Sequence, residues 1–371
     1  MSQNDTVYKI KDSVDLFLSN KKYLIAYYMN SRQRKNFRIN DEMIQLLECI
    51  DGIKTKSEIV GLMVDRGVSE GSVSYILNQL IQNRIITEIN ADDSIVSMAV
   101  KQRYARQINY FSEFLESEEQ GIRAQKKLMN SCILIFGCGA IGGNIALELA
   151  MAGVSRFILY DNDVVEESDA ARHLFYRKEY LGLKKTEALT IELRRINSLS
   201  ETECIDEFMA PNSNVEDLIK RADFVINTLD EPYIGYTSSK ISRLCMKYRI
   251  AHFIAGGFDA HLASTGELII PFVTPCVECY AGHFKEALKG WKPSKHPVEK
   301  RYDEIGGLAS MTLFSTSFAC IEIIKYLTGI IDLQKNYKIR GEFLFTDMSL
   351  TYLEVKRNPD CPICGENAYE P

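Results

Sequence analysis

Short runs in which apolar and polar residues alternate occupy the first forty positions of the chain. Residues 7–10, 14–18 and 23–28 are rich in β-branched and aromatic side chains and are separated by polar breaks. This period of two predicts three β-strands. The pattern changes after Asn40, because apolar residues then recur every three to four positions, which is the spacing of one helix face.

Three helices are predicted next, each from a polar cap followed by an apolar face. The first begins at Asn40, and Ser57 and Ser69 cap the other two. Alternation returns over residues 85–96, around the turn-forming sequence Asn-Ala-Asp-Asp, and predicts a β-hairpin. Three helices followed by a hairpin are the layout of a winged helix.

A continuous apolar run that begins at Cys132 changes the character of the chain. The run C-I-L-I-F is followed at once by a glycine-rich turn and by a helical pattern through Ala150. Similar apolar runs at 157–160, 224–228 and 252–255 are separated by helical stretches. Strands that alternate with helices predict a parallel, doubly wound sheet.

A length of 371 residues exceeds that of one ordinary domain, so we expect two. The patterns predict a small α+β winged-helix domain over residues 1–98 and an α/β domain with a Rossmann-like, mostly parallel sheet over residues 99–371. The third helix of a winged helix is the one that enters a DNA groove, yet residues 70–83 contain no lysine or arginine. Since phosphate contacts dominate DNA affinity, a peptide-binding or a structural module is favoured.

Composition excludes several classes of protein. Apolar residues make up 46% and charged residues 25%, which excludes wholesale disorder, and the formal net charge of −6 gives no basis for binding nucleic acid or an anionic membrane. The uncharged run between Glu304 and Glu322 contains several hydroxyl side chains and predicts a buried helix, not a membrane span. The first residues lack the pattern of a secretion signal, so a soluble, cytoplasmic protein is expected.

Four of the ten cysteines form two C-x-x-C pairs, Cys276 with Cys279 and Cys361 with Cys364. Two short pairs of thiolates supply closed tetrahedral coordination, which predicts a structural Zn²⁺ that fastens the C-terminal tail to the larger domain. The other six cysteines occur singly in apolar segments, where free thiols are typically small buried residues. The whole pattern is typical of a reducing compartment.

The turn after the first strand of the larger domain is the candidate nucleotide-binding loop. It precedes a helix whose N-terminal N–H groups favour a phosphate. The loop residues assigned to nucleotide binding are Gly137, Gly139, Ala140, Ile141 and Gly142. Asp161 ends the next strand, where a carboxylate accepts hydrogen bonds from ribose hydroxyls, and Asp163 follows it.

Two cations and a further carboxylate distinguish a triphosphate from a dinucleotide. Arg172 and Lys185 follow the second strand, and Asp230 lies at the end of the third. A dinucleotide has no need of such groups around its pyrophosphate, whereas a triphosphate carries four negative charges that must be held, with Mg²⁺, while pyrophosphate leaves. ATP and Mg²⁺ are therefore the predicted cofactors.

The chain resembles the E1-like (ThiF/MoeB) superfamily over about residues 101–366, on segments that occur in the family's order. The family includes ubiquitin-activating enzymes and the bacterial sulfur-carrier adenylyltransferases of the thiamin and molybdopterin pathways. The matching segments are R-Y-A-R-Q-I (103–108), G-C-G-A-I-G-G (137–143), D-N-D…S-D-A-A-R-H (161–173), G-L-K-K (182–185), Asp230, P-C-V-E-C (275–279), I-I-K-Y-L-T-G (323–329) and C-P-I-C (361–364).

The resemblance implies a role for each matching residue. Asp161 would hold the ribose, Arg172 and Lys185 the phosphates, and Asp230 the Mg²⁺. Arg106 would reach the triphosphate of the partner subunit, so the resemblance also implies a homodimer. The residues that it implies for catalysis are Arg106, Arg172, Lys185 and Asp230.

The chain departs from the family pattern at three points. Asp169 stands where the family usually has Asn, and His173 stands where it has Gln after the arginine. The Arg that normally follows the third strand is missing. ATP use is still implied, but these departures bear on how the activated carboxylate meets its acceptor.

Members of the family that form a thioester carry a nucleophilic cysteine after the first zinc pair. Residues 281–304 of this chain contain no cysteine, although they include His283 and His296. This argues against a ubiquitin-type or persulfide step.

An adenylating core joined to a winged helix resembles the peptide-modifying branch of the family, which matures microcin C7 and pantocin A. The resemblance implies that residues 1–98 bind the leader of a ribosomally synthesised precursor peptide, at an exposed strand edge, while the core adenylates a carboxylate during antibiotic biosynthesis. Pantocin-type activation of a glutamate side chain, with cyclisation, is the closer type.

Two alternatives remain open at this point. One is an adenylyltransferase for a sulfur-carrier protein that ends in Gly-Gly. The other is a non-catalytic scaffold that presents a leader peptide to a partner enzyme, although the intact Arg172, Lys185 and Asp230 count against it.

Overall fold

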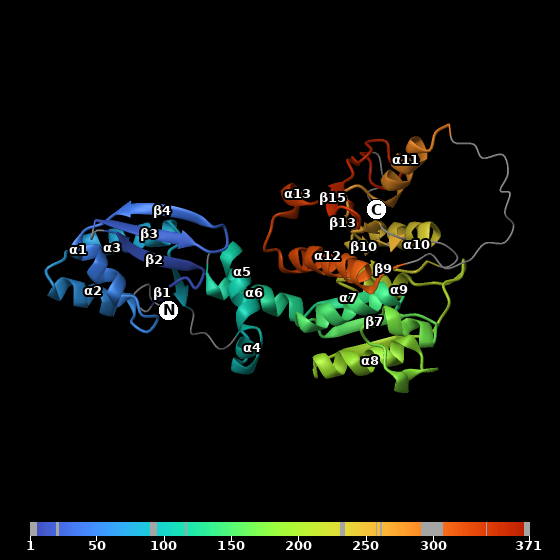
Figure 1. The fold of residues 1–371 in the computed structure, drawn as a ribbon, viewed down its shortest axis with the longest axis horizontal. Coiled ribbons are helices and arrows are strands. Elements are labelled where there is room, and N and C mark those ends of the chain that lie inside the picture. The colour runs from blue at the N-terminus through green and yellow to red at the C-terminus, as the bar shows by residue number, and fades with distance from the viewer. Residues whose placement is uncertain are drawn as a thin grey trace. The chain divides into compact units, whose positions relative to one another are not determined.

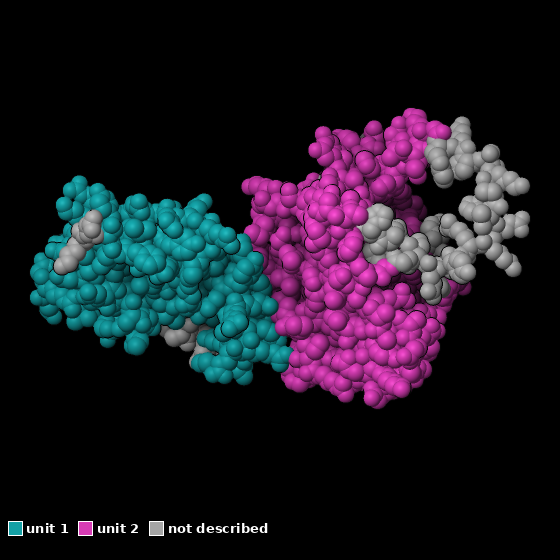
Figure 2. Space-filling view, viewed as in Figure 1, with its two compact units in different colours: residues 1–126 teal, residues 127–371 magenta. Residues whose placement is uncertain are grey.

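The chain forms two compact units, residues 1–126 and 127–371 (Figure 2). The sequence predicted a division after residue 98, whereas the helices that follow pack with the first unit. Lys11 Nζ donates to the carbonyl of Ser112 at 3.4 Å, and Asn109 Nδ2 donates to Asp12 at 3.0 Å. The computed structural model describes residues 6–19, 22–89, 95–115, 117–230, 234–256, 258–259, 262–290, 307–338 and 340–366.

The first unit is α+β, with small antiparallel sheets beside its helices (Figure 1). One sheet has the order β2-β3-β4, and β1 pairs with β5. The elements in chain order are β1 (Val7–Ile10), β2 (Val14–Ser19), β3 (Tyr23–Tyr28), β4 (Gln33–Arg38), α1 (Asp41–Cys49), α2 (Lys56–Asp65), α3 (Glu70–Gln82), β5 (Ile86–Ile89), α4 (Met98–Arg103), α5 (Ala105–Phe114) and α6 (Glu118–Met129).

Predicted caps begin two of the three helices. The side chains of Asn40 and Ser69 accept the N–H groups of Met43 and Ser72, which begins α1 and α3. The cap predicted at Ser57 is wrong. The helix is capped two residues earlier by Thr55, which forms a capping box with Glu58.

Two strand predictions in this unit differ from the structure. Strand β4 was not predicted, because Q-R-K-N-F-R has one apolar residue, Phe37, which packs against the core of the unit and gives no visible alternation. The hairpin predicted for residues 85–96 is replaced by pairing of β5 with β1, in which Ile86 faces Ile10. The intended turn at 90–94 lies outside the described residues.

The second unit is α/β and has a mostly parallel sheet of order β13-β10-β9-β6-β7-β8 and a smaller antiparallel sheet of order β11-β12-β14-β15. Its elements are β6 (Cys132–Phe136), α7 (Ala140–Met151), β7 (Arg156–Tyr160), the 3₁₀ turns η1 (Glu167–Ala171) and η2 (Lys178–Tyr180), α8 (Lys185–Ile196), β8 (Glu201–Ile205), α9 (Glu216–Lys220), β9 (Phe224–Asn227), α10 (Ile234–Lys247), β10 (His252–Ile254), β11 (Phe258–Asp259), β12 (Leu262–Ser264), β13 (Glu267–Ile269), α11 (Val277–Ala287), α12 (Ala309–Thr328), α13 (Leu333–Asn336), β14 (Gly341–Leu344) and β15 (Ser349–Tyr352).

The parallel strands are buried on both faces, which explains their continuous apolar runs. On one face, Leu134 and Val225 pack in a core with Ile241 of α10. On the other, the ring of Phe224 lies 5.4 Å from that of Tyr326 in α12, and α12 packs on α7. The predicted doubly wound sheet is confirmed, with strand ends within one residue of those expected.

Helix α12 contains most of the uncharged run and is largely buried, as predicted. No helix among the described residues is long and apolar enough to cross a lipid bilayer.

Candidate active site

The predicted nucleotide residues follow three neighbouring strands at one edge of the parallel sheet. Strand β6 pairs with β7 on one side and with β9 on the other, so the chain order reverses at β6. Gly137, Asp161 and Asp230 follow β6, β7 and β9 and therefore lie at the carboxyl ends of adjacent strands. Ligands of open α/β sheets bind at such a switch point.

The glycine-rich turn is shaped by close backbone packing. Gly137 has a φ of +89°, and a Cβ there would lie 2.5 Å from Thr228 Oγ1. A Cβ on Gly142 would lie 2.0 Å from the Gly137 carbonyl oxygen. Only glycine fits at either position.

The start of α7 leaves room for an anion. A Cβ on Gly139 would meet no heavy atom within 4 Å. Gly139 is the N-cap of α7 and forms no side-chain cap, so Ala140 and Ile141 begin the helix with N–H groups that no cap side chain accepts. Free N–H groups, a helix of twelve residues and an open approach fit a nucleotide phosphate.

Asp161 connects the turn to the end of β7. Its carboxylate oxygens accept the N–H of Cys138 at 2.6 Å and the N–H of Asp163 at 2.8 Å. Burial raises the pKa of Asp161, while these backbone hydrogen bonds oppose the rise. The side chain that the sequence predicted to bind ribose therefore also holds the loop in shape.

Lys185 and Arg172 are the cations of the site. Lys185 Nζ lies 2.9 Å from Asp163 Oδ2, and hydrogen bonding with Asp163 raises its pKa even though burial opposes this. The backbone N–H of Lys185 also donates to the Asp163 carbonyl at 3.0 Å. Arg172 is exposed at the end of η1. Asp163 thus fixes the orientation of the Lys185 side chain, whereas the Arg172 side chain is exposed to solvent.

Asp230 is exposed and lies just after the end of β9. The backbone before it is held by a buried network that sequence reasoning missed. Asn227 Nδ2 donates to Thr237 Oγ1 and Ser238 Oγ at 3.2 Å, and Thr237 Oγ1 donates to the Leu229 carbonyl at 2.7 Å. In the sequence, the only sign of this network was an amide side chain, Asn227, at the end of an apolar strand.

Thr228 is a second residue that the sequence reasoning missed. Its hydroxyl lies 3.0 Å from the Phe136 carbonyl and 2.9 Å from the Gly137 carbonyl. It therefore couples the end of β9 to the glycine-rich turn. Such contacts join residues about 90 positions apart in the chain, so spacing along the sequence does not reveal them.

Two of the three departures from the family pattern, Asp169 and His173, lie in contact. His173 Nε2 is 3.2 Å from Asp169 Oδ1, and both side chains are buried. The sequence flagged each residue separately, but their position four residues apart at the end of a 3₁₀ turn brings them together.

Arg106 is exposed on α5 and belongs to the first compact unit, whereas the other predicted nucleotide residues belong to the second. His283 is exposed on α11, and His296 lies outside the described residues.

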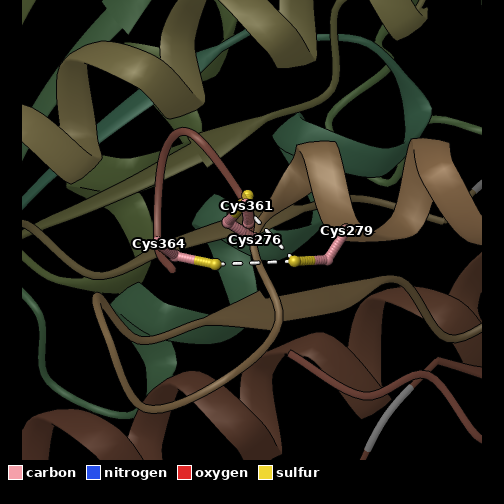
Figure 3. A group of neighbouring side chains, drawn as sticks. All are labelled: Cys276, Cys279, Cys361 and Cys364. Carbon is pink, nitrogen blue, oxygen red and sulfur yellow. Dashed lines mark hydrogen bonds between the residues drawn. The ribbon is translucent and has the colours of Figure 1, made fainter. Parts of the chain in front are cut away.

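The predicted metal ligands converge from two distant segments (Figure 3). Cys276 and Cys279 are at the start of α11, while Cys361 and Cys364 come from the C-terminal loop, and all four are buried. Neighbouring Sγ atoms are 3.5, 3.6 and 3.9 Å apart. Tetrahedral Zn–S bonds of about 2.3 Å place sulfurs about 3.8 Å apart, so the geometry fits Zn²⁺.

The six other cysteines are free thiols, and four of them are buried as predicted. Cys204 is exposed and Cys132 is half-buried, because β8 is the edge strand and Cys132 begins β6.

Comparison with known proteins identifies one family and solved structures that share the fold of this chain. The ThiF family model matches residues 104–363. Protein HesA (vegetative) of Trichormus variabilis is 28% identical over 253 residues, which is 67% of this chain and 86% of the relative.

Two solved structures match nearly the whole chain. The microcin C7 biosynthetic enzyme MccB, in complex with N-formylated MccA, gives a TM-score of 0.68 at 19% identity over 96% of this chain and 99% of MccB. PaaA gives 0.72 at 20% identity over 94% of this chain and 100% of PaaA. At these identities the matches show a shared fold.

Proposed function

The chain belongs to the ThiF family, and we propose that it is an ATP-dependent adenylyltransferase that activates a carboxylate of a ribosomally synthesised precursor peptide. The observation that carries the proposal is the convergence of Gly137, Asp161 and Asp230 at three adjacent strand ends, beside two cations. These are the groups that a triphosphate requires.

The chemistry follows from what each residue offers. The peptide carboxylate attacks the α-phosphorus of ATP, the bond to the bridging oxygen breaks, and pyrophosphate leaves. The N-terminus of α7 and Arg172 would hold phosphate oxygens, and Lys185 would exchange its contact with Asp163 for one with the leaving group. Asp230 would hold Mg²⁺, which neutralises charge on the phosphates when bound.

Two further parts complete the proposal. The four cysteines would hold one structural Zn²⁺. The enzyme would act as a homodimer in which Arg106 of one subunit reaches the triphosphate bound by its partner, as the family resemblance implies.

The products of ATP test the activity. Incubation of the chain with its precursor peptide and Mg-ATP is expected to release AMP and pyrophosphate, because attack at the α-phosphorus expels both terminal phosphates together. Nucleotide chromatography and exchange of labelled pyrophosphate into ATP measure this. ADP and inorganic phosphate as the main products would refute adenylation.

We also propose that residues 1–98 bind the leader of the precursor, along β4. Among the residues that the structure describes, this strand of the sheet β2-β3-β4 pairs only with β3, so its other edge offers main-chain groups to an extended peptide. Arg34 and Lys35 are exposed on it and lie over the rings of Tyr27 and Tyr28, at 5.7 and 5.2 Å. A leader peptide with acidic side chains would complement these positive charges.

An open groove at the end of β4 offers room for several side chains of a bound peptide. Its volume is about 740 Å³. The residues that line it include Arg38 of β4, Ile39 in the following link, Met43 of α1, and Ser72, Tyr75 and Ile76 of α3. MccB, whose fold this chain shares, has been solved with the peptide MccA and with ATP, which supports a peptide substrate.

Charge reversal on β4 tests the leader site in the full chain. The double variant Arg34→Glu/Lys35→Glu is expected to weaken precursor binding at least about tenfold, through lost attraction and added repulsion. Fluorescence anisotropy with labelled precursor measures the affinity, and Arg66→Glu, an exposed cation at the end of α2, is the matched control. Deletion of residues 1–98 should abolish peptide modification, but it cuts through the first compact unit, so the point variants are the sharper test.

If the double variant and the wild type bind the precursor with equal affinity, β4 does not bind the leader and has only a structural role. An adenylated small protein that ends in Gly-Gly, in place of a precursor peptide, would instead favour the sulfur-carrier alternative. The relatives named HesA and SAMP-activating enzyme E1 make that second test worthwhile.

A further inference from the structure

Asn144 is a fully buried amide in the second turn of α7, the helix that begins at the glycine-rich turn. Both polar atoms of its side chain bind a segment that lies about 30 positions further along the chain. Nδ2 donates to the Arg172 carbonyl at 3.1 Å, and Oδ1 accepts the N–H of Leu174 at 2.9 Å. These two bonds hold the main chain of residues 172–174 against α7, in the way that a neighbouring strand would.

Packing holds the same segment at two more points. The ring of Phe175 is fully buried against α7, where a Cβ on Gly143 would approach it to 2.4 Å. The His173 side chain is buried and lies 3.2 Å from Asp169. Before it in the chain, the Arg172 N–H donates to the Asp169 carbonyl at 3.1 Å. The Arg172 side chain itself is exposed, so the place of its guanidinium depends on where this main chain is held.

The held segment lies one helical turn from the end of α7 that would bind a phosphate. Ala140, which begins the helix, and Asn144 are four residues apart, so they lie on one face of the helix. The rise between them is about 6 Å along the axis. The long side chain of Arg172 therefore starts within reach of an anion at the N-terminus of α7.

Arg172 and Lys185 both act on one buried ring, so the two cations lie near each other. Burial lowers the pKa of His173, the Asp169 carboxylate raises it, and the positive charges of Lys185 and Arg172 lower it further. Lys185 is itself held 2.9 Å from Asp163, which follows β7 at the carboxyl edge of the sheet. Arg172 is thus anchored beside the second cation of the proposed site.

We propose that Asn144 is a positioning residue of the phosphate site, which fixes Arg172 relative to the N-terminus of α7 so that the helix and the guanidinium hold the triphosphate together. The inference rests on the proposed ATP site. Arg172 would contact the phosphates, and Asn144 acts only through it. Placement matters because a shift of about 1 Å in such a group can cost about 10²-fold.

Asn197 makes the same pair of bonds at the opposite end of the sheet. It is also buried, donates from Nδ2 to the Val154 carbonyl at 3.2 Å and accepts the N–H of Leu199 at 3.2 Å. Val154 precedes β7 and Leu199 precedes β8, so these bonds lie at the amino ends of the parallel strands. The nucleotide residues follow the carboxyl ends. Asn197 is therefore a matched control, with the same hydrogen bonds away from the site.

The affinities for Mg-ATP and for adenosine separate positioning from general damage. Asn144→Leu keeps the size of the side chain and removes both bonds. In titrations of the full chain it is expected to weaken ATP binding at least about tenfold, because a charge-assisted bond to phosphate is lost. Adenosine has no phosphate, so its affinity should stay within about twofold. Asn197→Leu should lower the midpoint of thermal unfolding similarly but leave the ratio of the two affinities unchanged.

A double-mutant cycle shows whether Asn144 acts through Arg172. In the Arg172→Ala background, Asn144→Leu should change ATP affinity less than about twofold, since no guanidinium remains to be placed. If the leucine variant does not fold, Asn144→Asp replaces it in both measurements. At pH 8 its ionised carboxylate still accepts the N–H of Leu174 but has no proton to donate to the Arg172 carbonyl. The same selective loss of ATP affinity is expected.

Unchanged ATP affinity, equal losses of ATP and adenosine affinity, or an undiminished effect in the Arg172→Ala background would each overturn the positioning role of Asn144. If the wild-type protein does not bind Mg-ATP, the proposed ATP site fails, and the inference fails with it. The two failures are distinguishable because the second appears without any variant.

Discussion

Replacement of Asp230 by alanine is expected to lower Mg²⁺-dependent turnover about 10³-fold, which corresponds to about 4 kcal/mol of transition-state stabilisation. The carboxylate follows β9 at the sheet edge, where it would hold the metal ion against the phosphates. The fold should not change, because the side chain is exposed and the backbone before it is held by Asn227 and Thr237. Pyrophosphate exchange over a range of Mg²⁺ concentrations measures the effect.

Asp217→Ala is the matched control for this prediction. That carboxylate is also in the second unit and is 90% exposed, on α9. Its loss should leave exchange within about twofold of wild type, since a surface ion pair contributes little. Unchanged Mg²⁺-dependent turnover in Asp230→Ala would contradict the assignment of Asp230.

Loss of the four-cysteine site is expected to destabilise the second unit by several kcal/mol, which is a large part of a typical stability of about 5–15 kcal/mol. Cys276 and Cys279 precede and begin α11, whereas Cys361 and Cys364 lie 85 positions further on, so the metal closes a long loop. Cys361→Ser leaves a buried site with one ligand missing. Thermal unfolding and the zinc content per chain measure both consequences.

Cys204→Ser is the control, because Cys204 is an exposed free thiol. The midpoint of unfolding should not change in this variant, and the protein should still contain one zinc per chain. Chelation of the wild-type protein should reproduce the loss of stability and should reduce activity only as the fold is lost. A folded, active protein without metal, or one that contains iron, would refute a structural zinc site.

Local chemistry along the chain was sufficient to predict much of the core. The runs at 132–136 and 157–160 are apolar because strands of a parallel sheet are buried on both faces. Asn40 and Ser69 cap helices through hydrogen bonds that span only three residues. Two C-x-x-C pairs in one chain are the spacing typical of a four-cysteine zinc site. Such features depend on near neighbours, so the sequence displays them directly.

The elements that were predicted wrongly depend on partners far away in the chain. Strand β4 is polar, and its pairing with β3 is what makes it a strand. Residues 86–89 were assigned to a hairpin, but their partner is β1, about 80 positions earlier. Neither choice is visible in local periodicity, because backbone hydrogen bonds carry no side-chain signature.

The site shows the same division. The sequence by itself predicted the candidate nucleotide-binding residues: the glycine-rich turn, Asp161, Arg172, Lys185 and Asp230. Only the tertiary structure decided that Asp161 holds the turn, that Thr228 joins β9 to Gly137, and that Asp169 and His173 meet in a buried pair. The physical reason is that a residue's type sets what its side chain can do, whereas burial and partners set which of those options remain.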